Sequence, residues 1–213
     1  MQDFPASLLD GYRSFMAGRY ARERTQYREL AESGQTPDTM IIACCDSRSA
    51  PESIFDAGPG ELFVLRNVAN LVPPFQPDAN QHGTSAAIEF AVNGLKIRNI
   101  VVMGHGRCGG IQAALDPTSR PLASGDFIGK WMSMLAAPAE QVSQYTALTA
   151  KERQTALERL SVRNSIANLR SFPYVAELEA KGELTLHGAW FDISSGELWI
   201  LDKASGDFSR PED

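Results

Sequence analysis

Apolar residues form three short runs without polar alternation in the first half of the chain. The runs cover residues 39–44 (TMIIAC), 61–66 (ELFVLR) and 99–103 (NIVVM), and a segment with helical spacing at 84–95 precedes the last of them. Unalternated strands separated by helices are typical of a parallel sheet that is covered on both faces. The pattern therefore predicts an α/β fold with a mainly parallel central sheet and helices on both faces.

The segment that precedes the first strand is helical in pattern. Residues 5–32 carry apolar and aromatic side chains at helical spacing, among them Leu8 and Tyr12, and a Ser-Gly pair follows them. We expect residues 1–34 to form an N-terminal helical arm that packs on a partner subunit. Residues 35–213 then form one α/β domain.

The second half of the chain predicts a long helix and a hairpin. Thr149 and Glu152 have the spacing of a capping box, which opens a helix that runs to about Leu169. Residues 184–193 (LTLHGAWFDI) and 197–204 (ELWILDKA) flank a Ser-Ser-Gly turn. We expect this C-terminal hairpin to add antiparallel strands to an edge of the sheet.

Composition excludes two classes of partner. The chain has 20 Lys and Arg against 26 Asp and Glu, a formal net charge of -6, and it contains no basic run. A polyanion would therefore meet repulsion, which argues against nucleic acid as a partner. No apolar run approaches the roughly 18 residues of a spanning helix, and the first residues lack the pattern of a signal peptide. We expect a cytoplasmic protein with no membrane partner.

Two of the predicted strands end in residues that carry chemistry. CCDSR, residues 44–48, ends the first strand, and GHGRCGG, residues 104–110, ends the third. Ligands of open α/β sheets bind outside the carboxyl ends of the strands. If the chain stays extended beyond the first strand, Cys44, Asp46 and Arg48 share one face.

The residues of these two stretches predict a zinc site. His105 and Cys108 lie three apart across a glycine-rich turn, and with Cys44 they form a Cys2His set. Zinc suits such ligands, and three protein ligands leave a fourth position open for catalysis. Two thiolates neutralise the metal, so we expect a less acidic zinc-bound water than on three histidines and activity that rises toward alkaline pH. Asp46 either takes the fourth position and closes the site, or is held by Arg48.

The remaining cysteine and two strand-end residues have structural interpretations. Three cysteines, two of them adjacent, make a poor disulfide framework. We expect Cys45 to be a small buried apolar residue. Arg66 and Asn67 are expected to tie a loop or a subunit interface together.

The two stretches also resemble a known family. The pattern CxDSR at residues 44–48, followed by HxxCGG at residues 105–110, resembles the signature of the beta class carbonic anhydrases. Residues 60–70 and 83–92 resemble further family segments, so the resemblance covers residues 35–115 almost continuously. It implies reversible hydration of CO2 to bicarbonate on one zinc ion per subunit, with an Asp and Arg pair beside the metal.

The resemblance also implies a substrate pocket. Gln35 would hydrogen-bond substrate or bicarbonate, Phe63 and Val68 would line an apolar CO2 pocket, and the amide of Gly109 would orient bicarbonate. The Gln and the Phe reach the pocket from a partner subunit, which makes a homodimer the smallest active unit, within a dimer or a higher homo-oligomer. Phe90 stands in this pocket where many relatives have Tyr.

One position assigns the chain to a branch of the family. In the branch that binds regulatory bicarbonate and closes, a Trp lies three residues before the first Cys, and here that position is Ile41. The pattern resembles the open, plant-like branch. We expect no bicarbonate-driven closure.

Three alternative functions are compatible with parts of the sequence. Residues 104–109 satisfy Gly-x-Gly-x-x-Gly after a strand, as a dinucleotide-binding loop does, although no strand with a terminal acid follows about 20 residues on. A redox or metal sensor would use the three cysteines and would have no need for the Asp and Arg pair. A related zinc hydrolase would act on carbon disulfide or carbonyl sulfide at the same site.

Overall fold

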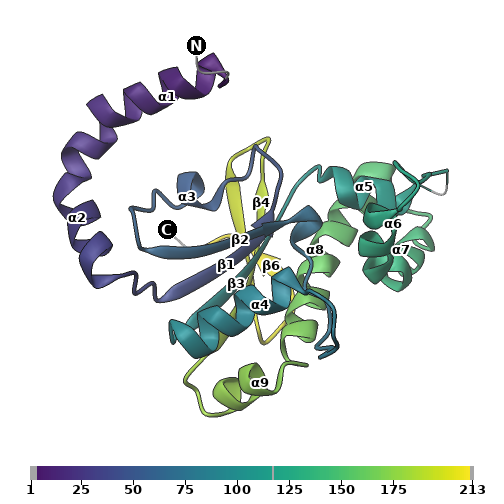
Figure 1. Ribbon diagram of the computed structural model, residues 1–213. Coiled ribbons are helices and arrows are strands. Elements are labelled where there is room, and N and C mark those ends of the chain that lie inside the picture. The colour runs from purple at the N-terminus through teal and green to yellow at the C-terminus, as the bar shows by residue number, and fades with distance from the viewer. Residues whose placement is uncertain (1–3, 117, 212–213) are drawn as a thin grey trace.

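The chain folds around a six-stranded sheet. Figure 1 shows the computed structural model, which describes residues 4–116 and 118–211. The strand order is β2-β1-β3-β4-β5-β6. The strands are β1 (Thr39–Cys44), β2 (Leu62–Asn67), β3 (Asn99–His105), β4 (Thr185–Asp192), β5 (Glu197–Leu201) and β6 (Phe208–Ser209).

Four of these strands are parallel. β2, β1, β3 and β4 run in one direction, and β5 and β6 pair antiparallel at one edge. The predicted hairpin is formed by β4 and β5, but its first strand joins the parallel part of the sheet. β6 was not predicted, because two residues are too few to show a period.

Helices of very different length connect the strands. The α-helices are α1 (Ala6–Ala17), α2 (Arg19–Ser33), α3 (Pro51–Ile54), α4 (Gly83–Glu89), α5 (Gly109–Leu115), α6 (Phe127–Met132), α7 (Ala136–Ser143), α8 (Ala150–Leu169) and α9 (Pro173–Ala180). Short 3-10 turns lie at Val68–Asn70 and Ser133–Leu135, and a π-helical turn at Phe90–Gly94 continues α4. No helix in the described ranges is both long and apolar enough to cross a membrane.

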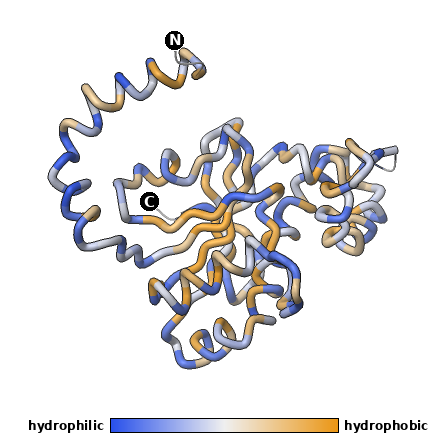
Figure 2. The backbone as a smooth tube through the Cα atoms, in the orientation of Figure 1, coloured by the Kyte–Doolittle hydropathy of each residue, from blue (hydrophilic) through white to orange (hydrophobic). Residues whose placement is uncertain are grey.

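The two faces of the sheet are covered unequally. Met40 and Ile42 pack into the main core with residues of α4, α8 and α9, whereas Ile41 and Ala43 face a smaller cluster that includes Ile54 of α3. Figure 2 shows the apolar strands at the centre of the molecule. The alternation follows from the period of two along a strand. The predicted fold class is confirmed, with most of the helical cover on one face.

Helix α8 lies close against the sheet. It begins with the predicted capping box, in which Thr149 Oγ1 accepts from the Glu152 amide at 3.2 Å and Glu152 Oε2 accepts from the Thr149 amide at 2.7 Å. Gly104 of β3 permits the close approach, since a Cβ there would lie 2.9 Å from Cγ2 of Val162. α8 therefore passes directly behind the end of β3.

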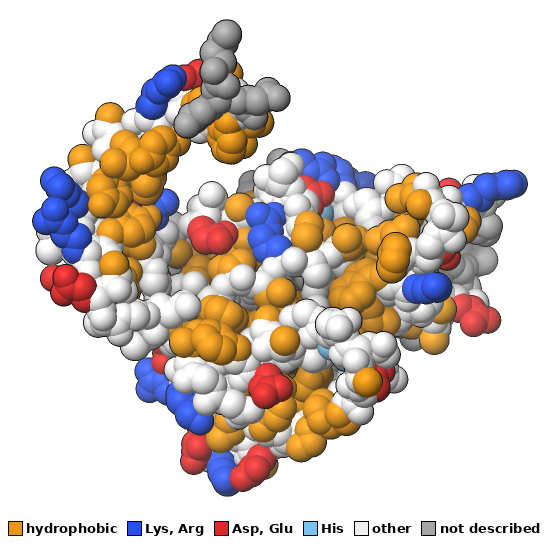
Figure 3. All heavy atoms as spheres, in the orientation of Figure 1, with side chains coloured by type: hydrophobic (Ala, Val, Ile, Leu, Met, Phe, Trp, Pro, Cys, Tyr) orange, Lys and Arg blue, Asp and Glu red, His pale blue; other side chains and the backbone are white. Residues whose placement is uncertain are grey.

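Helices α1 and α2 extend away from the sheet (Figure 1). They bury none of their residues within this chain. α2 touches the loop before β2 through Arg19, which donates to the Ala57 carbonyl at 2.8 Å. Figure 3 shows hydrophobic side chains gathered along this arm, and Leu8 and Tyr12 are each 58% exposed.

Candidate metal centre

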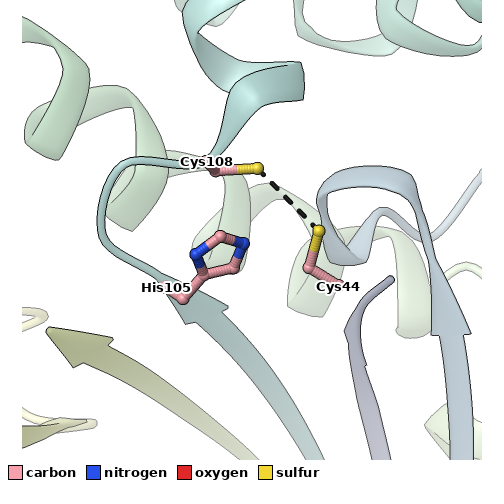
Figure 4. Close-up of side chains that lie close together, drawn as sticks. All are labelled: Cys44, His105 and Cys108. Carbon is pink, nitrogen blue, oxygen red and sulfur yellow. Dashed lines mark hydrogen bonds between the residues drawn. The ribbon is translucent and has the colours of Figure 1, made fainter. Parts of the chain in front are cut away.

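Three potential metal ligands meet at the carboxyl edge of the sheet. Cys44 is the last residue of β1, His105 is the last residue of β3, and Cys108 precedes α5. β1 and β3 are parallel neighbours, so their carboxyl ends coincide. The ligand atoms lie within 4.8 Å of one another, and the three residues are 5%, 1% and 2% exposed. Figure 4 shows the two sulfurs and the imidazole converging on one point.

The geometry of this cluster fits a tetrahedral zinc ion. The Sγ atoms of Cys44 and Cys108 are 3.9 Å apart, and two sulfurs at about 2.3 Å from a tetrahedral ion would lie about 3.8 Å apart. His105 Nδ1 donates to the Gly106 carbonyl at 2.9 Å, which leaves the lone pair on Nε2. Nε2 is buried and has no hydrogen-bond partner. An unpaired buried nitrogen beside two sulfurs indicates a metal position.

The cluster favours a thiolate at Cys44. The hydrogen bond from the Cys108 thiol lowers the pKa of Cys44 to about 4, against the opposing effect of burial, and His105 acts in the same direction. The amide of Ala69 also donates to Cys44 Sγ, at 3.3 Å. The pKa of Cys108 is raised, because this thiol keeps its proton beside the Cys44 thiolate. A thiolate is the form of cysteine that binds metal.

Asp46 and Arg48 form an ion pair at the mouth of the cluster. Arg48 Nε donates to Asp46 Oδ1 at 2.9 Å and Nη2 donates to Oδ2 at 2.7 Å, so the guanidinium engages both carboxylate oxygens. Asp46 Oδ2 lies 3.8 Å from His105 Nε2. The hydrogen bonds from Arg48 hold the pKa of Asp46 well below its usual range. The carboxylate therefore stays ionised next to the metal position.

The chain around this pair differs from the extended conformation expected from the sequence. β1 ends at Cys44, and the chain then turns, with the Ser49 amide donating to the Asp46 carbonyl at 3.1 Å. The turn itself brings Asp46 and Arg48 together. The expectation that Cys45 is buried was also wrong, because Cys45 is exposed. Its amide still donates to the Asn67 carbonyl at 2.9 Å, so the backbone is paired while the side chain faces outward.

Arg66 and Asn67 hold the loops that carry the cluster. Arg66 Nε donates to the Cys44 carbonyl at 2.8 Å and Nη2 to the Asp46 carbonyl at 2.6 Å. The Asn67 side chain accepts from the Leu71 amide and donates to the Leu71 carbonyl. Both residues therefore have the loop-tying role expected of them.

The predicted pocket residues lie in two separate places. Val68 and Gly109 are next to the cluster: Val68 follows β2, and its Cγ1 lies 3.0 Å from where a Cβ on Gly110 would be. Phe63 pairs in register with Met40, four positions before the Asn67 that pairs with Cys44. At about 3.3 Å per residue, this is about 13 Å from the metal position of the same chain.

Phe90 and Gln35 belong to the distant group. The Phe90 ring lies 5.9 Å from the Phe63 ring and its residue is 53% exposed. Gln35 is exposed in the segment before β1, at the amino end of the sheet. One chain therefore brings together the metal ligands, Asp46 and Arg48, but not the whole predicted pocket.

Ala69 and Glu158 contact the cluster in ways that were not expected from the sequence. Ala69 has a left-handed backbone, with a φ of 62°, which directs its amide at the Cys44 sulfur. Glu158 of α8 accepts from the Cys108 amide. The sequence contains a signal for the role of Glu158, because a charged residue on the same helix face as the apolar Leu157 and Val162 indicates a buried polar contact. It contains no such signal for the conformation of Ala69.

The fold contradicts the dinucleotide-binding alternative. The helix after the glycine-rich loop, α5, has seven residues, and the next strand is β4, which begins at Thr185. A dinucleotide-binding unit requires a βαβ unit of about 30 residues. His105 and Cys108 direct their side chains to each other instead. A mainly parallel sheet with two cysteines and one histidine at its carboxyl edge is typical of a zinc enzyme.

Comparison with known proteins identifies the family. The family model described as carbonic anhydrase matches residues 39–198. Beta carbonic anhydrase 3 of Arabidopsis thaliana is 36% identical over 201 residues, which cover 92% of this chain and 76% of the relative. The solved structure of the beta-carbonic anhydrase CcaA superposes with a TM-score of 0.89 at 29% identity, covering 97% of this chain and 92% of that one.

A tetrameric beta-carbonic anhydrase of Sordaria macrospora has a TM-score of 0.79 at 30% identity, and the match covers 95% of this chain and 97% of that one. The chain belongs to the beta carbonic anhydrases. It is a lyase that catalyses the zinc-dependent reversible hydration of CO2. The resemblance of its motifs to this family is confirmed.

Proposed function

We propose that each subunit hydrates CO2 at one zinc ion held by Cys44, His105 and Cys108, with Asp46 and Arg48 as the catalytic pair. The observation that carries the proposal is the buried cluster, in which two sulfurs lie 3.9 Å apart beside an imidazole nitrogen without a partner. Bound zinc supplies a Lewis acid that acidifies water at neutral to alkaline pH.

Arg48 keeps Asp46 available for catalysis. The guanidinium occupies one acceptor position on each carboxylate oxygen, which holds the carboxylate away from the metal. Oδ1 also accepts from the Arg48 amide at 3.0 Å, whereas Oδ2 retains a second acceptor position. Asp46 Oδ2, 3.8 Å from His105 Nε2, accepts a hydrogen bond from the reacting water and orients the water's free lone pair toward CO2.

The substrate pocket is apolar on one side and polar on the other. Val68 and Phe63 supply the apolar wall that concentrates CO2, and Phe90 extends it without the hydroxyl of a tyrosine. The Gly109 amide, at the first position of α5, donates to an oxygen of bicarbonate. Gln35 donates to the same product.

The pocket is completed by a second subunit. Phe63 lies about 13 Å along the sheet from the metal position of its own chain, which is too far for contact with the substrate there. A homodimer places Phe63 and Gln35 of each chain in the pocket of the other. The arm of residues 1–34 supports this assembly, because its exposed apolar side chains need a covering surface. The relative from Sordaria macrospora is a tetramer, which agrees with assembly from such dimers.

We place the protein in the cytoplasm. Two of its metal ligands are thiols, which must stay reduced to bind zinc, and the cytoplasm maintains reduced thiols. Fluorescence microscopy of a tagged chain in its native cell tests this location. A signal confined to another compartment would contradict it.

The test of the activity is stopped-flow hydration of CO2 with a pH indicator, on zinc-loaded protein, from neutral to alkaline pH. We expect rapid hydration that climbs with pH, since two thiolates donate charge to the metal. A flat or acid-shifted profile would contradict the proposed site chemistry. Hydrolysis of carbon disulfide or carbonyl sulfide without CO2 hydration would reassign the substrate.

A further inference from the structure

Helix α8 holds both backbone polar groups of one metal ligand. Glu158 Oε1 accepts from the Cys108 amide at 3.0 Å, and Gln154 Nε2 donates to the Cys108 carbonyl at 3.3 Å. Gln154 and Glu158 are four residues apart, so they lie on the same face of the helix. One rigid element thus contacts both the N–H and the C=O of Cys108, and the C=O also accepts from the Gln112 amide of α5 at 2.9 Å.

Glu158 is an unusual residue for its position. It is 1% exposed, and a carboxylate is seldom buried unless it is paired. Its second oxygen, Oε2, accepts from the indole Nε1 of Trp190 at 3.1 Å. Both oxygens therefore face N–H donors, and neither faces a positively charged side chain at hydrogen-bond distance. A glutamate that served packing alone could be replaced by an apolar residue at lower cost.

The close packing of α8 on β3 brings Glu158 to the Cys108 amide. Gly104 of β3 has no side chain, and a Cβ there would lie 3.5 Å from the Glu158 carbonyl oxygen as well as against Val162. His105 follows Gly104 directly. The close packing therefore sets α8 at a fixed height behind both the imidazole and the loop that carries Cys108.

We propose that Glu158 is a positioning residue for the metal centre: by holding the Cys108 amide it fixes the direction of the thiolate toward the ion, with Gln154 as its weaker partner. The inference rests on the metal site proposed above. Groups that orient a ligand from outside the coordination sphere change metal affinity by roughly 10- to 100-fold when they are removed.

The test compares two Glu→Gln substitutions on the same helix in the full-length protein. Glu158→Gln offers one oxygen and one NH2 group to two N–H donors, so one donor loses its acceptor. Glu152→Gln is the matched control, because Glu152 lies on α8 and also accepts from a backbone amide, that of the N-cap residue Thr149, but touches no ligand. The affinity for Zn²⁺ is measured by competition with a chromophoric chelator. The thiolate-to-metal charge-transfer band is recorded on the Co²⁺-loaded protein.

We expect Glu158→Gln to weaken Zn²⁺ binding by at least about tenfold and to shift the charge-transfer band, while Glu152→Gln changes neither. A purely structural glutamate would lower thermal stability and leave the band of the folded protein unchanged. Affinity within about threefold of the wild type, with an unshifted band, overturns the proposal, as does an equal loss in the control.

If Glu158→Gln fails to fold, Gln154→Ala decides the question, because it removes the half-buried side chain of α8 that donates to the Cys108 carbonyl and leaves the Gln112 amide as the other donor to that oxygen. A loss of Zn²⁺ affinity of about threefold or more supports the positioning role, and a smaller loss overturns it. Failure of the wild-type chain to bind Zn²⁺ would instead contradict the proposed metal site. The two failures are therefore distinguishable.

Discussion

The metal cluster and the distant pocket residues are built in opposite ways. Cys44, His105 and Cys108 are buried at the carboxyl edge of the sheet and held by their own chain. Phe90 is more than half exposed and packs against Phe63 near the amino end of the strands. In the proposed function, the chain thus completes its metal site alone and leaves part of its substrate pocket to assembly.

This difference separates two properties that are often measured together. Zinc binding depends on contacts within one chain, so it should survive dissociation of the subunits. If the pocket is shared between two chains as proposed, turnover should not survive this dissociation. Variants that change zinc binding without turnover, or turnover without zinc binding, therefore test whether the two properties have separate structural origins.

The largest effect is expected from Cys108→Ala. Loss of one thiolate ligand should weaken Zn²⁺ binding by more than about 100-fold, which is the largest loss expected for a residue that only orients a ligand. It should also abolish CO2 hydration. Cys45→Ala is the matched control, because Cys45 is adjacent to a ligand but exposed. Zinc content by atomic emission and stopped-flow hydration measure the result. Full zinc content in the Cys108 variant would contradict the ligand set.

The next largest effect is expected from charges on the arm. The double substitution Leu8→Asp and Tyr12→Asp places two carboxylates on exposed apolar positions, and burial of unpaired charge in an interface is unfavourable. We expect a smaller assembly by light scattering and hydration that falls on dilution, with zinc content unchanged. Substitution of Arg13, which is exposed on the same helix, with Ala is the control. Undiminished activity in a monomer would refute the shared pocket.

Arg48→Ala should have a smaller effect that depends on pH. The pKa of Asp46 is depressed in the folded chain, so the pair stabilises the fold above the ordinary carboxyl pKa and this contribution is lost as pH falls through the depressed value. The variant should be less stable than the wild type at neutral pH and equal to it in strong acid, as thermal melts at several pH values would show.

The same variant should lose about 100-fold in CO2 hydration at neutral pH, because Asp46 is free to bind the metal. Arg98→Ala is the control, since Arg98 pairs with Asp38 far from the cluster. A crystal structure of Arg48→Ala with water still on zinc would refute this explanation.

The smallest effect is expected from Phe90→Tyr, which adds the hydroxyl found in many relatives. Phe90 is 53% exposed in the single chain and its ring packs against Phe63, so the hydroxyl adds little to an existing apolar wall. Hydration should stay within about threefold of the wild type. A tenfold change in either direction would assign a catalytic part to that position.

Much of the fold and the metal set could be predicted because their signals are local. Unalternated apolar runs predicted β1 to β3, and Thr149 with Glu152 predicted the start of α8 to the residue. Parallel strands share a carboxyl edge, so residues at the ends of β1 and β3 had to meet. Recognising where the two strands end was therefore enough to find Cys44 and His105.

The rest depended on tertiary structure. The turn after Cys44 exposes Cys45, because the strand period no longer applies where the ladder ends. Ala69 adopts a left-handed backbone, which the sequence gives no reason to expect of alanine. The role of Glu158 required the height of α8 above the sheet, and that height is set by Gly104, more than 50 positions earlier.

The spacing of the two cysteines also affects the entropy of the unfolded chain. Cys44 and Cys108 are 64 positions apart, and an ion that binds both closes a loop of that length. In the chain-entropy treatment of cross-links, closing such a loop lowers the conformational entropy of the unfolded chain, which stabilises the folded state by about 4 kcal/mol. The loop contains α3, β2, α4 and β3, and thus two of the four parallel strands. Zinc bound at the proposed site would therefore cross-link a segment that holds half of the sheet's parallel strands, and the stability of that segment would depend on the bound metal.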